Sequence, residues 1–201
     1  MSAYRIGVLS LQGDFREHIR SVEATGHSGF GVNRAQEIST LDALILPGGE
    51  STTIAKLAQS FGLFKPIKEA IAGGLAVYGS CAGMILLARE IEGAGVGPES
   101  FGGIDMKVRR NAFGRQVDSF ETDIDFAGIE PAVRGVFIRA PWVESVGAGV
   151  TVLASVSTDS GMHPVAVRQG NLLATSFHPE LTQDSRVHRY FIEEIVAKAR
   201  R

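Results

Sequence analysis

A strand, a tight turn and a helix follow one another around the only cysteine of the chain. An apolar run ending at Tyr78 leads into Gly79-Ser80-Cys81-Ala82-Gly83, and a helix-like run over 84–89 leads out. The Gly-x-Cys-x-Gly spacing matches a nucleophile elbow with sulfur in place of oxygen. A Cβ at Gly79 or Gly83 would block so sharp a turn, so the glycines allow the Cys81 side chain to point into a cleft. Cys81 also precedes a helix, whose free N–H groups favour negative charge.

Near-continuous apolar runs alternate with helix-like segments through the first half of the chain. The runs at 4–9, 43–46 and 75–78 predict buried strands, and 30–32 predicts a weaker one. Helices are expected over 15–24, over 54–61 with an N-cap within Ser51-Thr52-Thr53, and over 65–72. Strands that are apolar on both faces are typical of a parallel sheet covered by helices. We therefore predict an α/β fold with a doubly wound, mostly parallel sheet.

The regions 104–125 and 136–169 have a different pattern, in which strand-like runs follow one another across short polar turns. The candidate strands are 106–108, 117–124, 150–156 and 164–168. We expect these runs to form an antiparallel extension of the sheet. Residues 172–175 then return to the parallel core, and a final helix is expected over 184–200. Its apolar stripe consists of Val187, Tyr190, Phe191, Ile195, Val196 and Ala199.

Length and composition limit the class of protein. The 201 residues suit one domain, 1–201, with a sizeable core. A formal net charge of −2 gives no reason to expect a nucleic-acid partner. The start lacks an apolar signal region, and no apolar run approaches the length that spans a membrane. We therefore expect a cytoplasmic protein that binds neither nucleic acid nor membrane.

A lone cysteine is more often a small buried hydrophobe than a nucleophile, so a catalytic role requires a base. His178 directly follows a strand end, and Glu180 lies two residues on, where its carboxylate can fix the imidazole tautomer. The other four histidines, His18, His27, His163 and His188, lack a strand-end Glu and an elbow partner. Ligands of open α/β sheets bind at the carboxyl ends of strands. The segments 12–13, 48–50, 81 and 177–180 all occupy such ends.

The loop Pro47-Gly48-Gly49-Glu50-Ser51 follows another predicted strand. A phosphate-binding loop is the first alternative, but the Gly-Lys-Ser/Thr that should follow is absent. An oxyanion site fits better, with one N–H from Gly48 or Gly49 and one from Ala82 holding a tetrahedral oxygen. Two successive glycines also let a peptide plane flip, so we expect this loop to be a point of control.

Taken together, these residues resemble the class I glutamine amidotransferases, the triad type with Cys at an elbow. The branch that matches best is the glutaminase of pyridoxal 5′-phosphate synthases. The resemblance spans nearly the whole chain and implies a flavodoxin-like fold. It rests on the segments 11–13, 16–18, 46–53, 80–83, 110–120, 135–141 and 176–182, which include Arg16-Glu17-His18 and Ser176-Phe177-His178-Pro179-Glu180-Leu181-Thr182.

The resemblance implies a role for each site residue. Cys81 would attack the side-chain carboxamide of L-glutamine, His178 would carry the proton, and Glu180 would orient His178. A γ-glutamyl thioester would form, and water would release glutamate. The residues implied to bind glutamine are Gly49, Glu50, Ser51, Arg110, Ile138 and Arg139.

The resemblance also implies a partner, a (β/α)₈-barrel synthase that uses the ammonia to build pyridoxal 5′-phosphate from a pentose phosphate and a triose phosphate. We expect no cofactor and no metal in this chain. Two alternatives stay open. One is a free-standing γ-glutamyl hydrolase or cysteine peptidase with the same triad, which needs no partner. The other is a non-enzymatic flavodoxin-like domain with a reactive cysteine, which leaves Glu180 unexplained.

Overall fold

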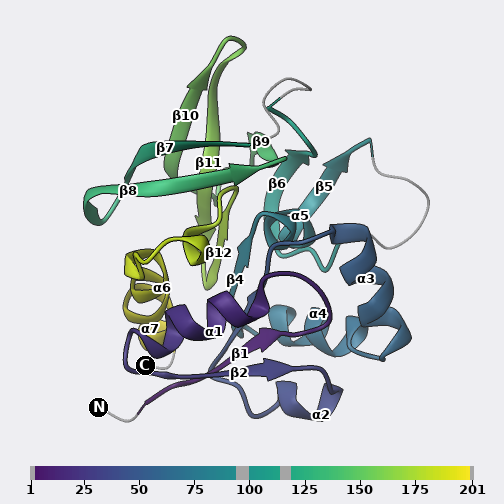
Figure 1. The fold of residues 1–201 in the computed structure, drawn as a ribbon. Helices are drawn as coiled ribbons and strands as arrows, with labels where there is room; N and C mark the ends of the chain where they lie inside the picture. The colour runs from purple at the N-terminus through teal and green to yellow at the C-terminus, as the bar shows by residue number, and fades with distance from the viewer. Residues whose placement is uncertain (1–2, 94–99, 114–118, 200–201) are drawn as a thin grey trace.

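The computed structural model describes residues 3–93, 100–113 and 119–199, and its centre is a twisted sheet of parallel strands (Figure 1). The strand order is β10-β11-β12-β4-β3-β1-β2. The five strands β2, β1, β3, β4 and β12 are parallel, in the order typical of flavodoxin-like folds. This confirms the predicted fold class. The strands are β1 Arg5–Leu9, β2 Ser28–Val32, β3 Ala43–Leu46, β4 Ala76–Ser80, β10 Thr151–Thr158, β11 Gly161–Gln169 and β12 Leu172–Thr175.

Successive residues of each strand point to opposite faces of the sheet, and helices cover both faces, so both are buried. Leu44, Leu46 and Val77 pack with helices α3, α4 and α5 in one core. Ile45 and Tyr78 pack on the other side with α1 and the C-terminal helical segment. The helices are α1 Phe15–Glu23, α2 Ala35–Ile38, α3 Ser51–Ser60, α4 Phe64–Ala72, α5 Ala82–Leu87, α6 Arg186–Tyr190 and α7 Ala197–Ala199, with the 3₁₀ turn η1 Pro179–Leu181 and the π-helical η2 Phe191–Val196.

Three helix predictions need correction. The cap of α3 is Glu50, whose carboxylate accepts from Thr52 N and Thr53 N, rather than a hydroxyl within 51–53. The helix after the elbow stops at Leu87, and Arg89 belongs to the strand β5 Ala88–Glu92. The C-terminal helix begins at Arg186 and contains a π-helical stretch, so its buried stripe shifts.

The π-helical stretch has a local consequence for the stripe predicted from the sequence. Within η2, Ile192 is buried although it was not part of the predicted stripe, whereas Ala199 is exposed. An i+5 hydrogen-bond pattern rotates the following residues relative to an α-helix. The predicted members Val187, Phe191 and Ile195 keep their place in the core.

The middle region is only partly an extension of the central sheet. β10 and β11 join it antiparallel, as expected. The other strands form separate sheets: β5 with β6 Ile104–Arg109 and β9 Trp142–Val146, and β7 Ser119–Phe126 with β8 Ile129–Ile138. The β5–β6 pair is parallel, which the sequence did not suggest. Of the segment expected to be strand over 117–124, residues 117 and 118 lie outside the described residues, as do 114–116 of the 110–120 motif.

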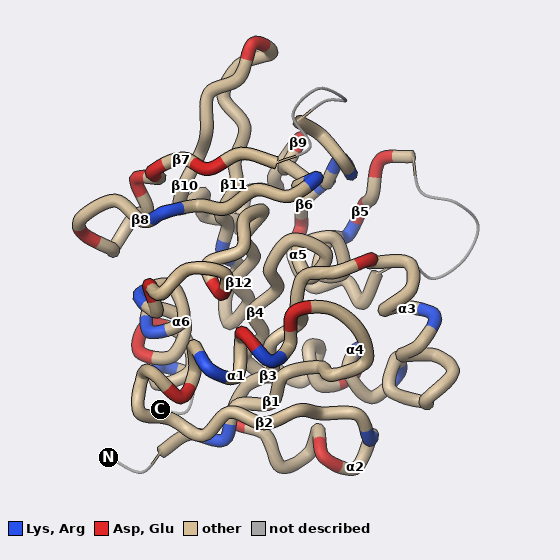
Figure 2. Tube along the Cα trace, viewed as in Figure 1, with Lys and Arg blue, Asp and Glu red and all other residues tan. Residues whose placement is uncertain are grey.

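Charged side chains avoid the middle of the sheet. The segments β3 and β4 carry none, while acidic and basic residues gather on helices and on the outer hairpins (Figure 2). Within the described residues, no helix is both long enough and apolar enough to cross a membrane. The buried polar or charged residues among the described ones are His18, Ser51, Ser80, Thr175, Ser176, His178, Glu180 and His188.

Candidate active site

The register of two neighbouring strands brings Cys81 and His178 together. Thr175, at the end of β12, pairs with Ser80 of β4, and the Cys81 N–H donates to the Thr175 carbonyl at 2.8 Å. His178 then lies three residues beyond this pair, where its N–H donates to the Val136 carbonyl of β8 at 2.9 Å. Two hydrogen-bonded ladders therefore hold the nucleophile candidate and the base candidate at the same edge of the sheet.

The elbow has the geometry that the glycine spacing predicts. Cys81 adopts φ 48° and ψ −101°, in the region that L-residues avoid. A Cβ at Gly79 would lie 2.4 Å from the Gly83 backbone, and one at Gly83 would lie 2.2 Å from the Leu46 carbonyl oxygen. Such contacts cannot relax, since both partners are backbone. The two glycines therefore permit the turn that carries Cys81.

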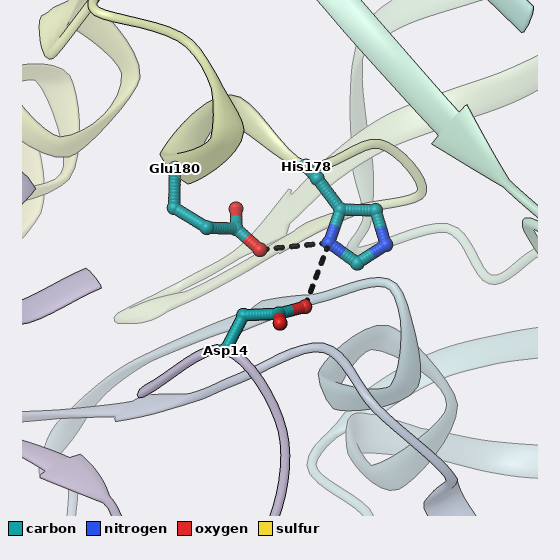
Figure 3. A group of neighbouring side chains, drawn as sticks. All are labelled: Asp14, His178 and Glu180. Carbon is teal, nitrogen blue, oxygen red and sulfur yellow. Dashed lines mark hydrogen bonds and ion pairs between the residues drawn. The ribbon is translucent and has the colours of Figure 1, made fainter. Parts of the chain in front are cut away.

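His178 is buried, and two carboxylates, those of Glu180 and Asp14, face its Nδ1 (Figure 3). Its Nδ1 donates to Glu180 Oε1 at 2.7 Å, and Asp14 Oδ2 lies 3.7 Å from the same nitrogen. One ring nitrogen of His178 and one carboxylate oxygen each of Asp14 and Glu180 lie within 4.8 Å of one another. Glu180 is the closer of the two carboxylates to Nδ1 and is therefore its hydrogen-bond partner. The second ring nitrogen, Nε2, is therefore not engaged by Glu180.

The charges around His178 stabilise its protonated form. Burial opposes that charge, but the hydrogen bonds and negative charges of Cys81 and Glu180 raise the pKa of His178 to about 11. Burial likewise opposes ionisation of Glu180, but His18 and His178 hold the pKa of its carboxyl well below the usual range. Burial raises the pKa of Asp14, while His178 acts in the opposite direction. An imidazolium bound to Cys81 and Glu180 is therefore the favoured charge state.

The loop after β3 lies directly against His178. A Cβ at Gly48 would come 2.3 Å from His178 Cε1, so only glycine fits there. The Gly48 carbonyl accepts from Asp14 N at 3.3 Å. Gly49 has φ 146°, and the next N–H, that of Glu50, donates to Gln12 Oε1 at 2.9 Å. The loop is thus fastened to the segment after β1.

A cavity of about 420 Å³ opens above Cys81. The residues predicted to bind glutamine, Gly49, Glu50, Ser51, Arg110, Ile138 and Arg139, all line it together with Cys81, Ala82 and His178. Gly48 stands behind this wall, against His178. The structure also places Gln12 in the lining, at a strand end where the sequence predicted ligand binding, and adds Asp14, Ile85, Asn111 and Pro141, which were not predicted to bind glutamine.

Two exposed segments supply the arginines of the cavity. Arg139 has φ 43° and follows β8, and Asn111, next to Arg110, has φ 47°. The Ala112 N–H donates to the Ala140 carbonyl at 3.0 Å, which holds the two segments side by side. Arg110 reaches across to α3, where its Nη1 lies 3.3 Å from Thr52 Oγ1. Glu50 lines the cavity, although its carboxylate also caps α3.

One expectation about the histidines is wrong. His18 has both an elbow neighbour and a Glu partner: its Nε2 lies 2.9 Å from Ser80 Oγ and 3.3 Å from Glu180 Oε1. Its Nδ1 lies 2.8 Å from His188 Nε2. Both histidines are fully buried. The spacing of His18 from Phe15 and Val22, on the apolar face of the predicted helix, was the available signal.

Comparison with known proteins gives one consistent family. Residues 8–197 match the SNO glutamine amidotransferase family. A pyridoxal 5′-phosphate synthase subunit PdxT of Parafrankia sp. (strain EAN1pec) is 60% identical over 96% of this chain and 94% of its own length. The PdxT subunit of Mycolicibacterium vanbaalenii is 57% identical over 97% of this chain and 100% of its own. A crystal structure of a glutamine amidotransferase has a TM-score of 0.88 at 48% identity, with 96% of this chain and 98% of that one covered. This chain belongs to the SNO glutamine amidotransferase family.

Proposed function

We propose that this protein hydrolyses L-glutamine to glutamate and ammonia, and that it does so as the glutaminase subunit of a pyridoxal 5′-phosphate synthase. The observation that carries the proposal is the chain of contacts from Cys81 to His178 and from His178 to the buried Glu180, in which Cys81 and His178 line the cavity. The shared family and the printed name of the PdxT relatives support the same assignment.

The chemistry follows from the three side chains. The sulfur of Cys81 attacks the carboxamide carbon of glutamine, and the C–N bond breaks after His178 delivers a proton to the nitrogen. Ammonia and a γ-glutamyl thioester result. Water, deprotonated by His178, then attacks the thioester carbon, and the C–S bond breaks to give glutamate and the free thiol. Glu180 holds the imidazole through Nδ1 and leaves Nε2 for these transfers.

The developing oxyanion requires donors placed before the reaction. We assign this task to the N–H of Ala82, at the start of α5, and to the Gly48-Gly49 loop. The Gly48 carbonyl is directed to Asp14 N, and the N–H of the same planar peptide, that of Gly49, points the opposite way. The 3.3 Å distance from Asp14 N to the Gly48 oxygen is long for a hydrogen bond, so a flip of this peptide plane loses only a weak hydrogen bond.

Recognition of the substrate amino acid falls to the cavity walls. Arg110 and Arg139 supply positive charge for the α-carboxylate of glutamine. The Glu50 carboxylate and the Ile138 carbonyl oxygen, which lies 4.0 Å from Cys81 Sγ, are acceptors for the α-ammonium group. Gly49 and Ser51 complete the wall beside the elbow. This set distinguishes free glutamine from an amide within a peptide.

Ammonia is mostly ammonium near neutral pH and is then no nucleophile, so direct transfer to a second active site is advantageous. We propose that the acceptor is a (β/α)₈-barrel synthase subunit, and that its docking next to Gln12 and Asp14 sets the Gly48-Gly49 plane in its productive orientation. Losing one oxyanion donor costs roughly 3 kcal/mol, or about a hundredfold in rate, so the isolated chain is a poor glutaminase.

The test is a titration of the purified chain with its cognate synthase at saturating glutamine, with glutamate as the readout. Glutamate release that rises and saturates at a fixed subunit ratio is expected, and Cys81→Ala should give none at any ratio. Equal release with and without synthase would reject gating and favour a free-standing hydrolase. No release under any condition would reject the glutaminase assignment and leave a non-enzymatic domain.

A further inference from the structure

A second pair of histidines lies beneath the triad, away from the cavity. His18 of α1 and His188 of α6 have no exposed surface, and their rings contact at 2.8 Å between Nδ1 and Nε2. His18 Nε2 faces Glu180 Oε1, the same oxygen that receives His178, and also faces Ser80 Oγ. Ser80 immediately precedes Cys81. The His18 ring therefore contacts Glu180 of the triad and also Ser80, the residue before Cys81.

The hydrogen-bond pattern restricts the tautomers of this pair. Burial lowers the pKa of His188 to about 3, so His188 is neutral and carries one ring hydrogen. Its Nδ1 is buried and has no hydrogen-bond partner in the described residues. A hydrogen there would be an unsatisfied buried donor, which is the costlier arrangement. The hydrogen of His188 therefore sits on Nε2 and is donated to His18 Nδ1.

This donation decides what His18 presents to the triad. With Nδ1 accepting from His188, the ring nitrogen of His18 that can donate is Nε2, where Ser80 and Glu180 lie. The reverse tautomer would turn a lone pair toward the Glu180 carboxylate and repel it. An apolar residue would fill the same space without the desolvation cost of two imidazoles. Packing alone therefore does not explain the pair.

We propose that His18 is a positioning residue of the glutaminase reaction: its Nε2–H, fixed by His188, holds the Glu180 carboxylate so that Glu180 in turn orients His178. The proposal rests on the proposed function, because it assigns His18 to that same triad. It also gives a role to the Arg16-Glu17-His18 motif, which catalysis and glutamine binding leave unexplained. His18 touches no reacting atom, so its effect passes through Glu180, directly and by way of Ser80 Oγ, which donates to the same Glu180 oxygen at 3.5 Å.

The first experiment measures glutaminase kinetics of the complex with synthase for three variants. His18→Leu removes the donor and should lower kcat about 10- to 100-fold with KM changed less than about twofold, as expected when a hydrogen bond to a buried charge is lost. His18→Gln places an amide N–H near the former Nε2 and should recover most of kcat. His27→Gln, a half-buried histidine at the opposite end of the sheet, should match the wild type.

Two kinetic results would overturn the proposal. One is a kcat of His18→Leu within about twofold of the wild type. The other is an equal loss in His18→Leu and His18→Gln that parallels a loss of thermal stability, because a purely structural role is not rescued by an amide donor. If His18→Leu fails to fold, His18→Gln is compared with the control His27→Gln. A kcat of His18→Gln more than about tenfold below that of His27→Gln would contradict the proposal, because the amide donor would not replace the imidazole.

A second readout does not depend on glutaminase activity. The Nδ1–H of His178, donated to Glu180 at 2.7 Å, should give a downfield proton resonance in the ¹⁵N-labelled full chain. We expect this resonance to move or broaden in His18→Leu and to return in His18→Gln. An unchanged resonance in His18→Leu would refute the positioning role of His18, whatever the glutaminase activity. Absence of glutamate release in the wild type would instead refute the proposed function.

Discussion

The two sides of the Cys81 cavity are built differently. Behind the cavity wall, next to Glu180, lie three fully buried groups that do not line the cavity: His18, His188 and Ser80, on helices and on a central strand. The opposite side is made of Arg139 and Asn111, which are exposed and adopt positive φ at the ends of outer segments. One side is fixed by the core, and the other is open to whatever enters the cavity.

Under the proposed function, this difference separates the residues that carry the chemistry from those that recognise glutamine. The relative positions of Cys81, His178 and Glu180 are determined by strand register and by buried hydrogen bonds, so they exist before substrate arrives. The segments of Arg110 and Arg139 are joined by the Ala112–Ala140 backbone bond, and Arg110 also contacts Thr52 on α3, so these arginines lie on outer segments rather than in the core. Substitutions on the buried side should therefore lower kcat, and substitutions on the open side should raise KM.

The largest effect is expected from Cys81→Ala. Without the sulfur there is no thioester, so glutaminase activity should fall more than about 1000-fold. The elbow glycines, not the thiol, permit the turn, so the unfolding temperature should stay within a few degrees of the wild type. Glutamate release and thermal unfolding measure the two quantities. A glutamine-analogue electrophile should label the wild type at Cys81, and turnover by the alanine variant would contradict its assignment as nucleophile.

Cys81→Ala should also change the protonation of His178. The wild-type pKa of about 11 depends on the hydrogen bond and charge of Cys81 as well as on Glu180. Removing the sulfur removes one of these supports while burial continues to oppose the charge, so the pKa should fall. An NMR titration of the His178 ring would show deprotonation at lower pH in the variant. An identical titration in both proteins would mean that Cys81 carries no negative charge.

His178→Asn should be nearly as damaging as loss of the nucleophile, and Glu180→Gln less so. Removing the base stops proton transfer, whereas removing the orienting carboxylate only misplaces the base. By analogy with other triads, Glu180→Gln should be roughly a hundredfold less harmful than His178→Asn. Both should act on kcat in steady-state assays with the synthase. A wild-type kcat for Glu180→Gln would transfer the orienting role to Asp14, 3.7 Å from His178 Nδ1.

Gly13→Ala tests how firmly the oxyanion loop is held. Gly13 has φ 96°, and a Cβ there would lie 1.7 Å from the Gly48 carbonyl oxygen. The carbonyl must therefore move, which alters the donor geometry beside Cys81 and should lower kcat roughly a hundredfold. Gly26→Ala is the matched control, because Gly26 has φ 85° but nothing within 4 Å of its Cβ position. Equal kcat values for the two variants would show that loop placement does not limit the reaction.

The sequence predicted the parallel core and the triad because both depend on local patterns. Apolar runs at strand spacing, the elbow glycines and the His-x-Glu pair were visible without tertiary information. The cap of α3 was misassigned because Glu50 reaches forward to Thr52 and Thr53, and carboxylate capping competes with the hydroxyl pattern. The single-domain organisation of the whole chain remains a prediction.

The polar core escaped prediction for a different reason. The contact between His18 and His188 joins two helices from opposite ends of the chain, and no local pattern encodes it. The separate sheets of the middle region escaped for the same reason, since strand runs alone do not indicate which neighbour each strand pairs with. Long-range pairing, rather than local propensity, is what the structure adds to the site.

Arg139→Ala should have the smallest effect and should act on the open side alone. Loss of one positive charge beside the α-carboxylate should raise KM for glutamine about tenfold, equivalent to about 1.4 kcal/mol of binding, with kcat within about twofold. Arg134→Ala is the matched control, because Arg134 lies on β8 but pairs with Glu121 and Asp123 at 3.1 and 3.2 Å instead of facing the cavity. Its KM should equal the wild type. If Arg139→Ala also left KM unchanged, Arg110 would carry the carboxylate alone; if it lowered kcat instead, the two sides of the cavity would be coupled and the separation of chemistry from recognition would fail.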